Sequence, residues 1–112
     1  MSAPSAVFAN PHRGEVLLTL GSTQYKLRPS FEALAMAEQS TGSLIALVER
    51  AGSGQILIGD IVSLLHACAV AGGHDVAKDD FAAQILDAGV SVAAVPMQQL
   101  LKTIMTGTSG DS

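Results

Sequence analysis

Two long stretches of this chain carry no formally charged residue, and they limit how the chain can fold. One stretch runs from Ile61 to His74 and the other from Ala88 to Leu101, with histidine counted as neutral. A helix without charge around its circumference is hard to bury completely in a small domain, because small domains have proportionally more surface. Either neutral polar residues form the solvent faces, or one helix offers an apolar face to another protein or to a second copy. The neutral polar candidates are Ser63, His66, Gln98 and Gln99.

Residues 15–28 have the pattern of a β-hairpin. In the strands expected at Glu15–Leu20 and Thr23–Arg28, Leu18 and Leu20 alternate with Thr19, and Tyr25 and Leu27 alternate with Lys26. This period of two is expected of strands with one buried face. Gly21-Ser22 between them suits a tight two-residue turn. Pro29 lacks a backbone N–H and therefore ends the second strand.

Helical spacing and capping residues predict about five short helices after the hairpin. Ser30 and Ser43 supply N-cap oxygens for the first two helices. Phe31 and Leu34 are the expected core anchors of the first helix. The predicted helices span residues 31–38, 44–50, 61–71, 80–88 and 91–106.

Three local features refine the later helices. Ile56–Ile58 is predicted to be a brief extended segment that places one side chain in the core. Asp79 can cap the fourth helix. Pro96 either kinks the last helix or occupies the first position of a helix that starts there. The inward-facing side chains expected from the fourth helix are Phe81, Ile85 and Leu86.

These elements predict an α+β fold, with an N-terminal β-hairpin followed by about five short α-helices in a mostly helical single domain. The domain is expected to cover residues 14–106. Residues 1–13 mix Ser, Ala, Pro and Asn without a period, and are expected to form a flexible N-terminal arm. Residues 107–112, GTSGDS, are expected to be a disordered tail.

Charge and cysteine content exclude several classes of function. Charged residues make up 14% of the chain, and the net charge is −4; typical domains contain about 25% charged residues. The basic residues are spread along the chain without the cluster that phosphate binding requires, so no nucleic-acid partner is expected. Cys68 is the only cysteine, which rules out an intramolecular disulfide and favours a reducing compartment. Residues 1–8 lack a signal-peptide pattern, and no apolar run approaches the ~20 residues that span a bilayer. An intracellular protein without a membrane partner is expected.

The titratable side chains do not form a catalytic or metal-binding pattern. His66 lies two positions from Cys68 on a predicted helix, so the two side chains point to different faces. His74 and the pair Asp79–Asp80 lack zinc or EF-hand ligand spacing. Cys68 lies on an apolar stripe, without the activating cation that a catalytic thiol needs. We therefore predict a protein that is not an enzyme, with no catalytic, cofactor-binding or metal-binding residues and no cofactor.

The last helix is the best candidate for a partner-binding surface. It is uncharged over most of its length and adjoins the polar tail. It also carries methionines, which suit a surface that must accept varied apolar partners. The predicted partner-binding residues are Met97, Leu100, Leu101, Ile104 and Met105.

The passage from the hairpin into the first helix resembles a known family. It reads Gly14-Glu-Val-Leu-Leu-Thr-Leu, then Tyr25-Lys-Leu-Arg-Pro-Ser-Phe-Glu-Ala-Leu-Ala, with Thr41-Gly42 further on. This is similar to the tail-protein family of alphaproteobacterial prophages and gene transfer agents that is known by the tenth gene product of the agent's cluster. The segment before the hairpin, the run Ile58–Leu65 and the closing helix fit the same pattern. The resemblance covers roughly residues 9–106.

The resemblance implies a part in building a non-contractile tail. The family is described both as a tail tube protein and as a tail assembly chaperone, which would coat the tape-measure protein and bring tube subunits to it. A tube subunit needs a sheet that closes with its neighbours into a ring, and this sequence predicts only one hairpin and one short extended segment. We therefore expect a tail assembly chaperone in the cytoplasm of the bacterial host. Its expected partners are the tape-measure protein and tail tube subunits, with a homo-oligomer left open. A tube subunit retained in the particle is the alternative.

Overall fold

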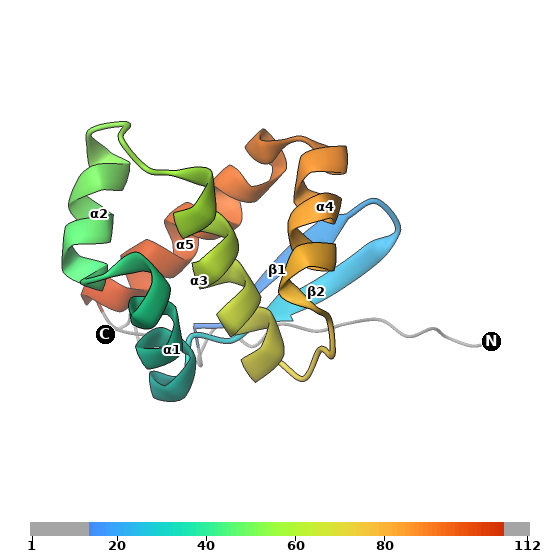
Figure 1. Cartoon of the computed structure of the whole chain (residues 1–112). Helices are drawn as coiled ribbons and strands as arrows, with labels where there is room; N and C mark the ends of the chain where they lie inside the picture. Colours follow the sequence, from blue (N-terminus) through green and yellow to red (C-terminus); the bar gives the residue numbers. More distant parts are fainter. Residues whose placement is uncertain (1–13, 107–112) are drawn as a thin grey trace.

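The computed structural model describes residues 14–106, which form a two-stranded hairpin followed by helices (Figure 1). This arrangement confirms the predicted α+β fold. The predicted arm at residues 1–13 and the predicted tail at 107–112 lie outside the described residues. The elements are β1 (Val16–Leu20), β2 (Thr23–Leu27), α1 (Phe31–Thr41), α2 (Leu44–Gly52), α3 (Ile58–Ala71), α4 (Lys78–Ala88), the short 3₁₀ helix η2 (Val90–Ala93) and α5 (Ala94–Thr106).

The hairpin has the predicted two-residue turn. Leu20 pairs with Thr23 across the turn, and Gly21 adopts a φ of 62° whereas Ser22 keeps a negative φ. A positive φ at the first turn residue alone is the pattern of a type II′ turn, which matches the natural twist of the strands. Four side chains that point toward the helices are buried and alternate with less buried neighbours, which confirms the predicted alternation. They are Leu18, Leu20, Tyr25 and Leu27.

The outer edge of β2 is closed by the end of α3 and the loop after it. The backbone N–H of Arg28 donates to the carbonyl of Cys68 at 2.9 Å. The backbone N–H of Lys26 donates to Nε2 of His74 at 2.8 Å. This close approach depends on Gly72, because a Cβ atom there would collide with the carbonyl oxygen of Lys26.

The first uncharged stretch forms α3, the central helix of the fold. It packs against α1 on one side and against β2 and α4 on the others. Small residues on the facing side of α1 allow the two helices to lie close together. The buried residues of α3 are Asp60, Val62, Ser63, Leu64, Leu65, Ala67, Cys68 and Ala69. Ser63 is therefore buried rather than part of a solvent face.

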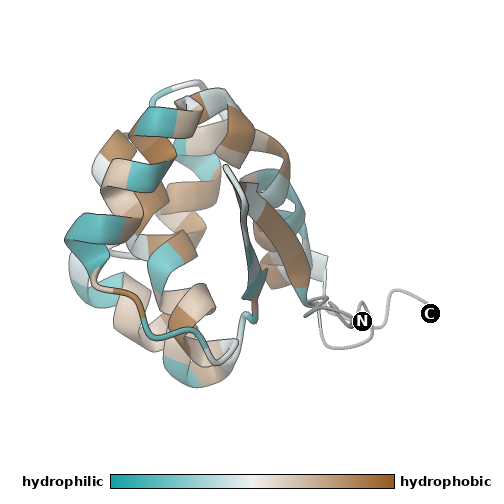
Figure 2. Cartoon of the chain, turned by 90° about the vertical axis from the view of Figure 1, so that its right-hand side faces the viewer, coloured by the Kyte–Doolittle hydropathy of each residue, from teal (hydrophilic) through white to brown (hydrophobic). Residues whose placement is uncertain are grey.

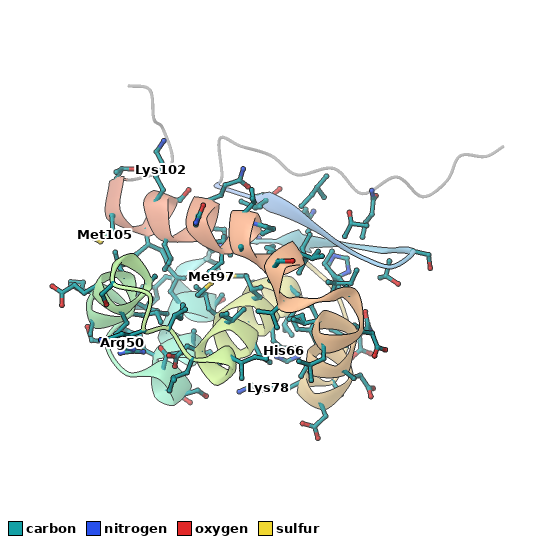
Figure 3. All side chains as sticks on the ribbon, turned by 90° about the horizontal axis from the view of Figure 1, so that it is seen from above. Arg50, His66, Lys78, Met97, Lys102 and Met105 are labelled. Atoms are coloured by element: carbon teal, nitrogen blue, oxygen red, sulfur yellow. The ribbon has the colours of Figure 1, made fainter. Side chains whose placement is uncertain are left out.

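The second uncharged stretch forms η2 and α5. Seen from above, α5 and the hairpin lie on one side of the molecule, and α1 to α4 lie on the other (Figure 3). α5 packs against β1, and η2 packs against both β1 and α4. Gln98 and Gln99 are exposed, as expected of a neutral polar solvent face.

The first helix begins where predicted, but one of its expected anchors is wrong. Ser30 caps α1, its Oγ accepting from the N–H of Ala33 at 3.1 Å, and Ser43 caps α2 in the same way. Leu34 packs against the core as expected. Phe31 does not, because 85% of its side chain is exposed. The face of α1 that turns inward contains Ala33, and Phe31 lies two positions away on nearly the opposite side of the helix.

Three predicted helix starts differ from the structure. α3 begins at Ile58, so the extended segment ends at Leu57; Ile56 is the one side chain of that segment that packs against the core. α4 begins at Lys78, and Asp79 lies in its first turn instead of capping it. Pro96 is the third residue of α5, and so neither kinks the helix nor starts it. Proline is tolerated there because the first N–H groups of a helix have no intrahelical acceptor.

Candidate functional site

The five predicted partner-binding residues do not share one exposed surface. Met97, Leu100 and Leu101 are buried, Ile104 is half-buried, and Met105 has 53% of its side chain exposed. Figure 3 shows Met97 and Met105 on the side of α5 that faces the other helices, whereas Lys102 points away from them. Of the five residues, Met105 is the one available for direct contact, and partner binding through this helix stays a prediction.

Two of these buried residues line an apolar pocket. Met97 and Leu101 contribute the wall on α5, and the pocket has a volume of about 190 Å³. Val90 and Gln98 also line it and are exposed, so the pocket reaches the surface. The remaining apolar wall comes from the end of α2, the following loop and the start of α3. The apolar residues of this second wall are Ala51, Ile56 and Ile61.

A second apolar hollow lies between α3 and α4 and was not predicted. It is a groove of about 280 Å³ in which Ile58 and Val62 face Ala82 and Leu86. Leu86 is exposed, so the expectation that it faces the core is wrong. Gly59 also lines the groove, and its missing side chain helps to leave the groove open.

The sequence contained part of the signal for this groove. Ile58 and Val62 are four residues apart, as are Ala82 and Leu86, and residues at that spacing lie on the same face of a helix. Each pair therefore marks an apolar strip on its own helix. That the two strips lie opposite one another depends on how α3 packs against α4, which the sequence pattern does not contain.

A partly buried ion pair holds the start of α3 against the end of α2. The guanidinium of Arg50 donates to the carboxylate of Asp60 at 2.9 Å, and the same carboxylate oxygen accepts from the N–H of Leu57 at 3.2 Å. Asp60 is buried, and a buried carboxylate needs such partners. The pair joins the end of α2 to the start of α3, next to the pocket lined by Ile56 and Ile61.

The cysteine has a structural environment. Cys68 is fully buried in the core, and burial raises the pKa of its thiol to about 12. A thiol with that pKa is protonated at neutral pH and is a poor nucleophile. Its backbone carbonyl, by contrast, accepts the N–H of Arg28 and so helps to close the edge of β2.

The two described histidines are bound to backbone groups. Nε2 of His66 lies 2.6 Å from the carbonyl oxygen of Val76, which can only accept, so this nitrogen carries the proton. Nε2 of His74 accepts from the N–H of Lys26, so the proton of neutral His74 is on Nδ1. Burial, and secondarily the charge of Lys26, lower the pKa of His74. His66 is half-buried, as expected.

Comparison with known proteins identifies the family. Within residues 14–106, no group of three or more His, Cys, Asp and Glu side chains is placed to hold a metal ion. None of the helices in that range has the length and apolar character needed to cross a membrane. No curated protein and no solved structure matched the chain in searches of each. Residues 13–107, which include every strand and helix described above, match a family of phage tail proteins. The chain therefore belongs to the family described as phage tail tube protein, GTA-gp10.

Proposed function

We propose that this protein is a non-enzymatic tail assembly chaperone, which binds helices of the tape-measure protein through an apolar surface and helps to recruit tail tube subunits. Family membership gives the role in a phage tail. The chaperone role is more specific than this role in a phage tail, and it is the part that we propose. We propose that it acts in the cytoplasm of the bacterial host during assembly and does not stay in the finished particle.

The observation that carries the proposal is the amount of apolar surface outside the core. The pocket beside Met97 and Leu101 is lined mainly by apolar side chains. The groove between α3 and α4 combines four aliphatic side chains with Ser63, Lys78 and Asp79. Each hollow includes exposed aliphatic lining residues, such as Val90 in the pocket and Leu86 in the groove. Amphipathic helices bind proteins by laying apolar side chains into hollows of this kind. A long helical protein such as a tape-measure protein presents many such side chains.

The small sheet supports the same proposal. A tube wall built from continued sheet requires strands whose edges pair with neighbours. Within residues 14–106 the sheet has two strands, and the outer edge of β2 is closed by His74 and Cys68. A sheet with one closed edge cannot be extended from both sides into a ring.

A structural tube subunit, retained in the particle, is the second candidate. Membership of a family described as phage tail tube proteins favours it. It would require contacts between subunits that use helices, or one sheet edge only, instead of a continuous wall of strands.

The test is co-expression with the tape-measure protein of the same gene cluster, followed by pull-down and size-exclusion chromatography. We expect a complex with the full chain. Met105→Asp and Leu86→Asp each place a charge on an exposed apolar residue without disturbing the core, so at least one should weaken binding about tenfold or more. The variant that does so identifies the end of α5 or the α3–α4 groove as the binding surface.

Matched controls use exposed residues of the same two helices. Gln99→Asp adds the same charge to the outer side of α5, and Ala83→Asp adds it to α4 beside the groove. Both controls should bind the tape-measure protein normally. The absence of any complex, with the chain instead forming rings or tubes with itself, would overturn the chaperone proposal in favour of the structural subunit.

A further inference from the structure

The outer edge of β1 has backbone groups that no strand or side chain of residues 14–106 pairs with. Antiparallel strands alternate between pairs that exchange hydrogen bonds and pairs whose N–H and C=O groups point outward. Leu20 and Thr23 flank a two-residue turn and therefore exchange hydrogen bonds, which makes Leu17 and Thr19 the outward-pointing residues of β1. The same alternation directs the N–H of Lys26 outward from β2, where it meets His74 as observed.

The two edges of the hairpin differ in how their outward backbone groups are hydrogen-bonded. The outward N–H of Lys26 in β2 is bonded to His74, and the N–H of Arg28 just after β2 is bonded to Cys68. Within residues 14–106, no strand or side chain is bonded to the outward groups of Leu17 and Thr19. Exposed strand edges normally carry a lysine, a proline or a bulge that prevents pairing with another chain. β1, with the sequence Val-Leu-Leu-Thr-Leu, has none of these.

The side chains of this edge are also apolar. Leu17 has 39% of its side chain exposed on the outer face of the sheet. Figure 2 shows the apolar ribbon of β1 beside the more polar ribbon of β2. The neighbouring elements η2 and α5, which pack against β1, carry the exposed Val92 and Val95. An apolar edge with free hydrogen-bonding groups is a site for strand addition.

We propose that β1 pairs with β1 of a second copy of the chain, antiparallel and around a two-fold axis at Leu18. In this register Leu17 of each copy lies opposite Thr19 of the other. Both residues point their backbone groups outward, so each of the two pairs can exchange both of its hydrogen bonds. The two hairpins then form one sheet of four strands, with β2 of each copy as an outer strand.

The edge suits a second copy better than an unrelated strand because it is self-complementary. A two-fold interface brings the same residues together from both sides. The strand has no charge to repel its own copy, and its outward pairs combine Leu with Thr in both directions. The inference does not depend on the proposed tape-measure binding, because it rests on the backbone of β1, whereas that proposal uses Met105 of α5 or the groove between α3 and α4.

The test uses two double variants of the full chain. Leu17→Glu with Thr19→Glu places like charges opposite each other in both cross-copy pairs, whereas Leu17→Glu with Thr19→Lys places opposite charges there. Within each hairpin, position 17 faces Lys26 in both variants, so the folded monomer is affected alike at that position. Sedimentation equilibrium should show a wild-type dimer of twice the 11.4 kDa chain mass.

The double-Glu variant should dissociate roughly tenfold more readily than the Glu/Lys variant, because two pairs change from attraction to repulsion. Amide hydrogen exchange gives a second measurement. The N–H groups of Leu17 and Thr19 should become protected as the dimer forms, whereas that of Lys26 should be protected at every concentration. A wild-type monomer with these two amides already protected would overturn the proposal by showing that another part of the chain covers the edge. A dimer equally stable in both double variants would show that positions 17 and 19 do not lie opposite each other, and would overturn the proposed register.

Discussion

The helices α3 and α5 have similar uncharged compositions but different surroundings. α3 is enclosed by α1, β2 and α4, and its apolar residues are buried around most of its circumference. α5 packs against β1 and η2, with Val95 and Met105 exposed along with its glutamines. Each helix has a single charged residue. Asp60 in α3 is buried and paired, and Lys102 in α5 is exposed.

The difference shows that the absence of charge has two structural meanings. In α3 it reflects burial by neighbours on several sides, and in α5 it accompanies an uncharged but exposed surface. The second case is the one that leaves apolar area for a partner. The predictions below compare matched positions in the two helices, from the largest expected effect to the smallest.

Removing a large side chain should give the largest difference in the free energy of unfolding between a variant in α3 and a variant in α5. Leu65→Ala in α3 leaves a cavity at a fully buried position, and should lower the free energy of unfolding by about 2–5 kcal/mol. Val95→Ala in α5 removes exposed atoms and should change it by less than about 0.5 kcal/mol. Urea unfolding of both variants measures these changes in the free energy of unfolding. Equal losses would mean that α5 is as enclosed as α3.

The charged residues of the two helices should also respond differently. Arg50→Met leaves the buried carboxylate of Asp60 without its 2.9 Å partner, and should cost about 1–2 kcal/mol because Arg50 is itself partly exposed. Lys102→Met removes an exposed charge from α5 and should be nearly neutral. Thermal unfolding at matched ionic strength compares the two. An unchanged midpoint for Arg50→Met would show that the pair does not hold α2 against α3.

His74, in the loop that follows α3, should give the protein a pH dependence. The pKa of His74 is lowered in the folded state, so the unfolded chain binds more protons as the pH falls through the ordinary histidine value of 6.5. The stabilisation is therefore present above pH 6.5 and is lost as the pH falls below it. Protonation also removes the acceptor for the N–H of Lys26.

Unfolding measured between pH 7.5 and 5.5 tests this expectation. The slope of stability against pH should be smaller for His74→Gln than for the wild type, although the variant is less stable throughout because it changes the acceptor of the Lys26 N–H. Tyr25, which packs edge-on against the His74 ring, is unaltered in this variant. Identical slopes would assign the pH dependence to other groups.

The smallest effect on folding should come from the exposed end of α5. Met105→Asp should change the free energy of unfolding by less than about 0.5 kcal/mol, since the side chain is largely exposed. Under the proposed function this stable variant binds the tape-measure protein less well. Fluorescence-monitored binding to a tape-measure fragment separates the two properties. A loss of stability as large as the loss of binding would place Met105 among the core residues.

The sequence predicted those parts of the fold that depend on local signals. Gly21-Ser22 marked the turn, and Ser30 and Ser43 marked two helix starts, because a turn or an N-cap is specified within a few residues. The faces of the helices were harder to predict. Phe31 and Leu86 are large and apolar but exposed. Phe31 is exposed because α1 approaches α3 on another face, through small residues such as Ala33, whereas Leu86 lies in the groove between α3 and α4.

The candidate site was predicted only in part for the same reason. The stripe from Met97 to Met105 is a real apolar face of α5, but neighbouring elements cover most of it. Which end stays exposed depends on α2, the loop at Ile56 and α3. The groove between α3 and α4 arises from two helices together, and neither strip of residues specifies its partner.

The measurement that most directly tests the account is the protein composition of purified tail-containing particles, compared by quantitative mass spectrometry with the lysate in which they assemble. The chaperone account predicts that this chain is abundant in the lysate, in complex with the tape-measure protein, and absent from purified particles. A fixed ratio of this chain to the other tail proteins within the particles, at many copies per tail, would contradict the account and establish a structural subunit.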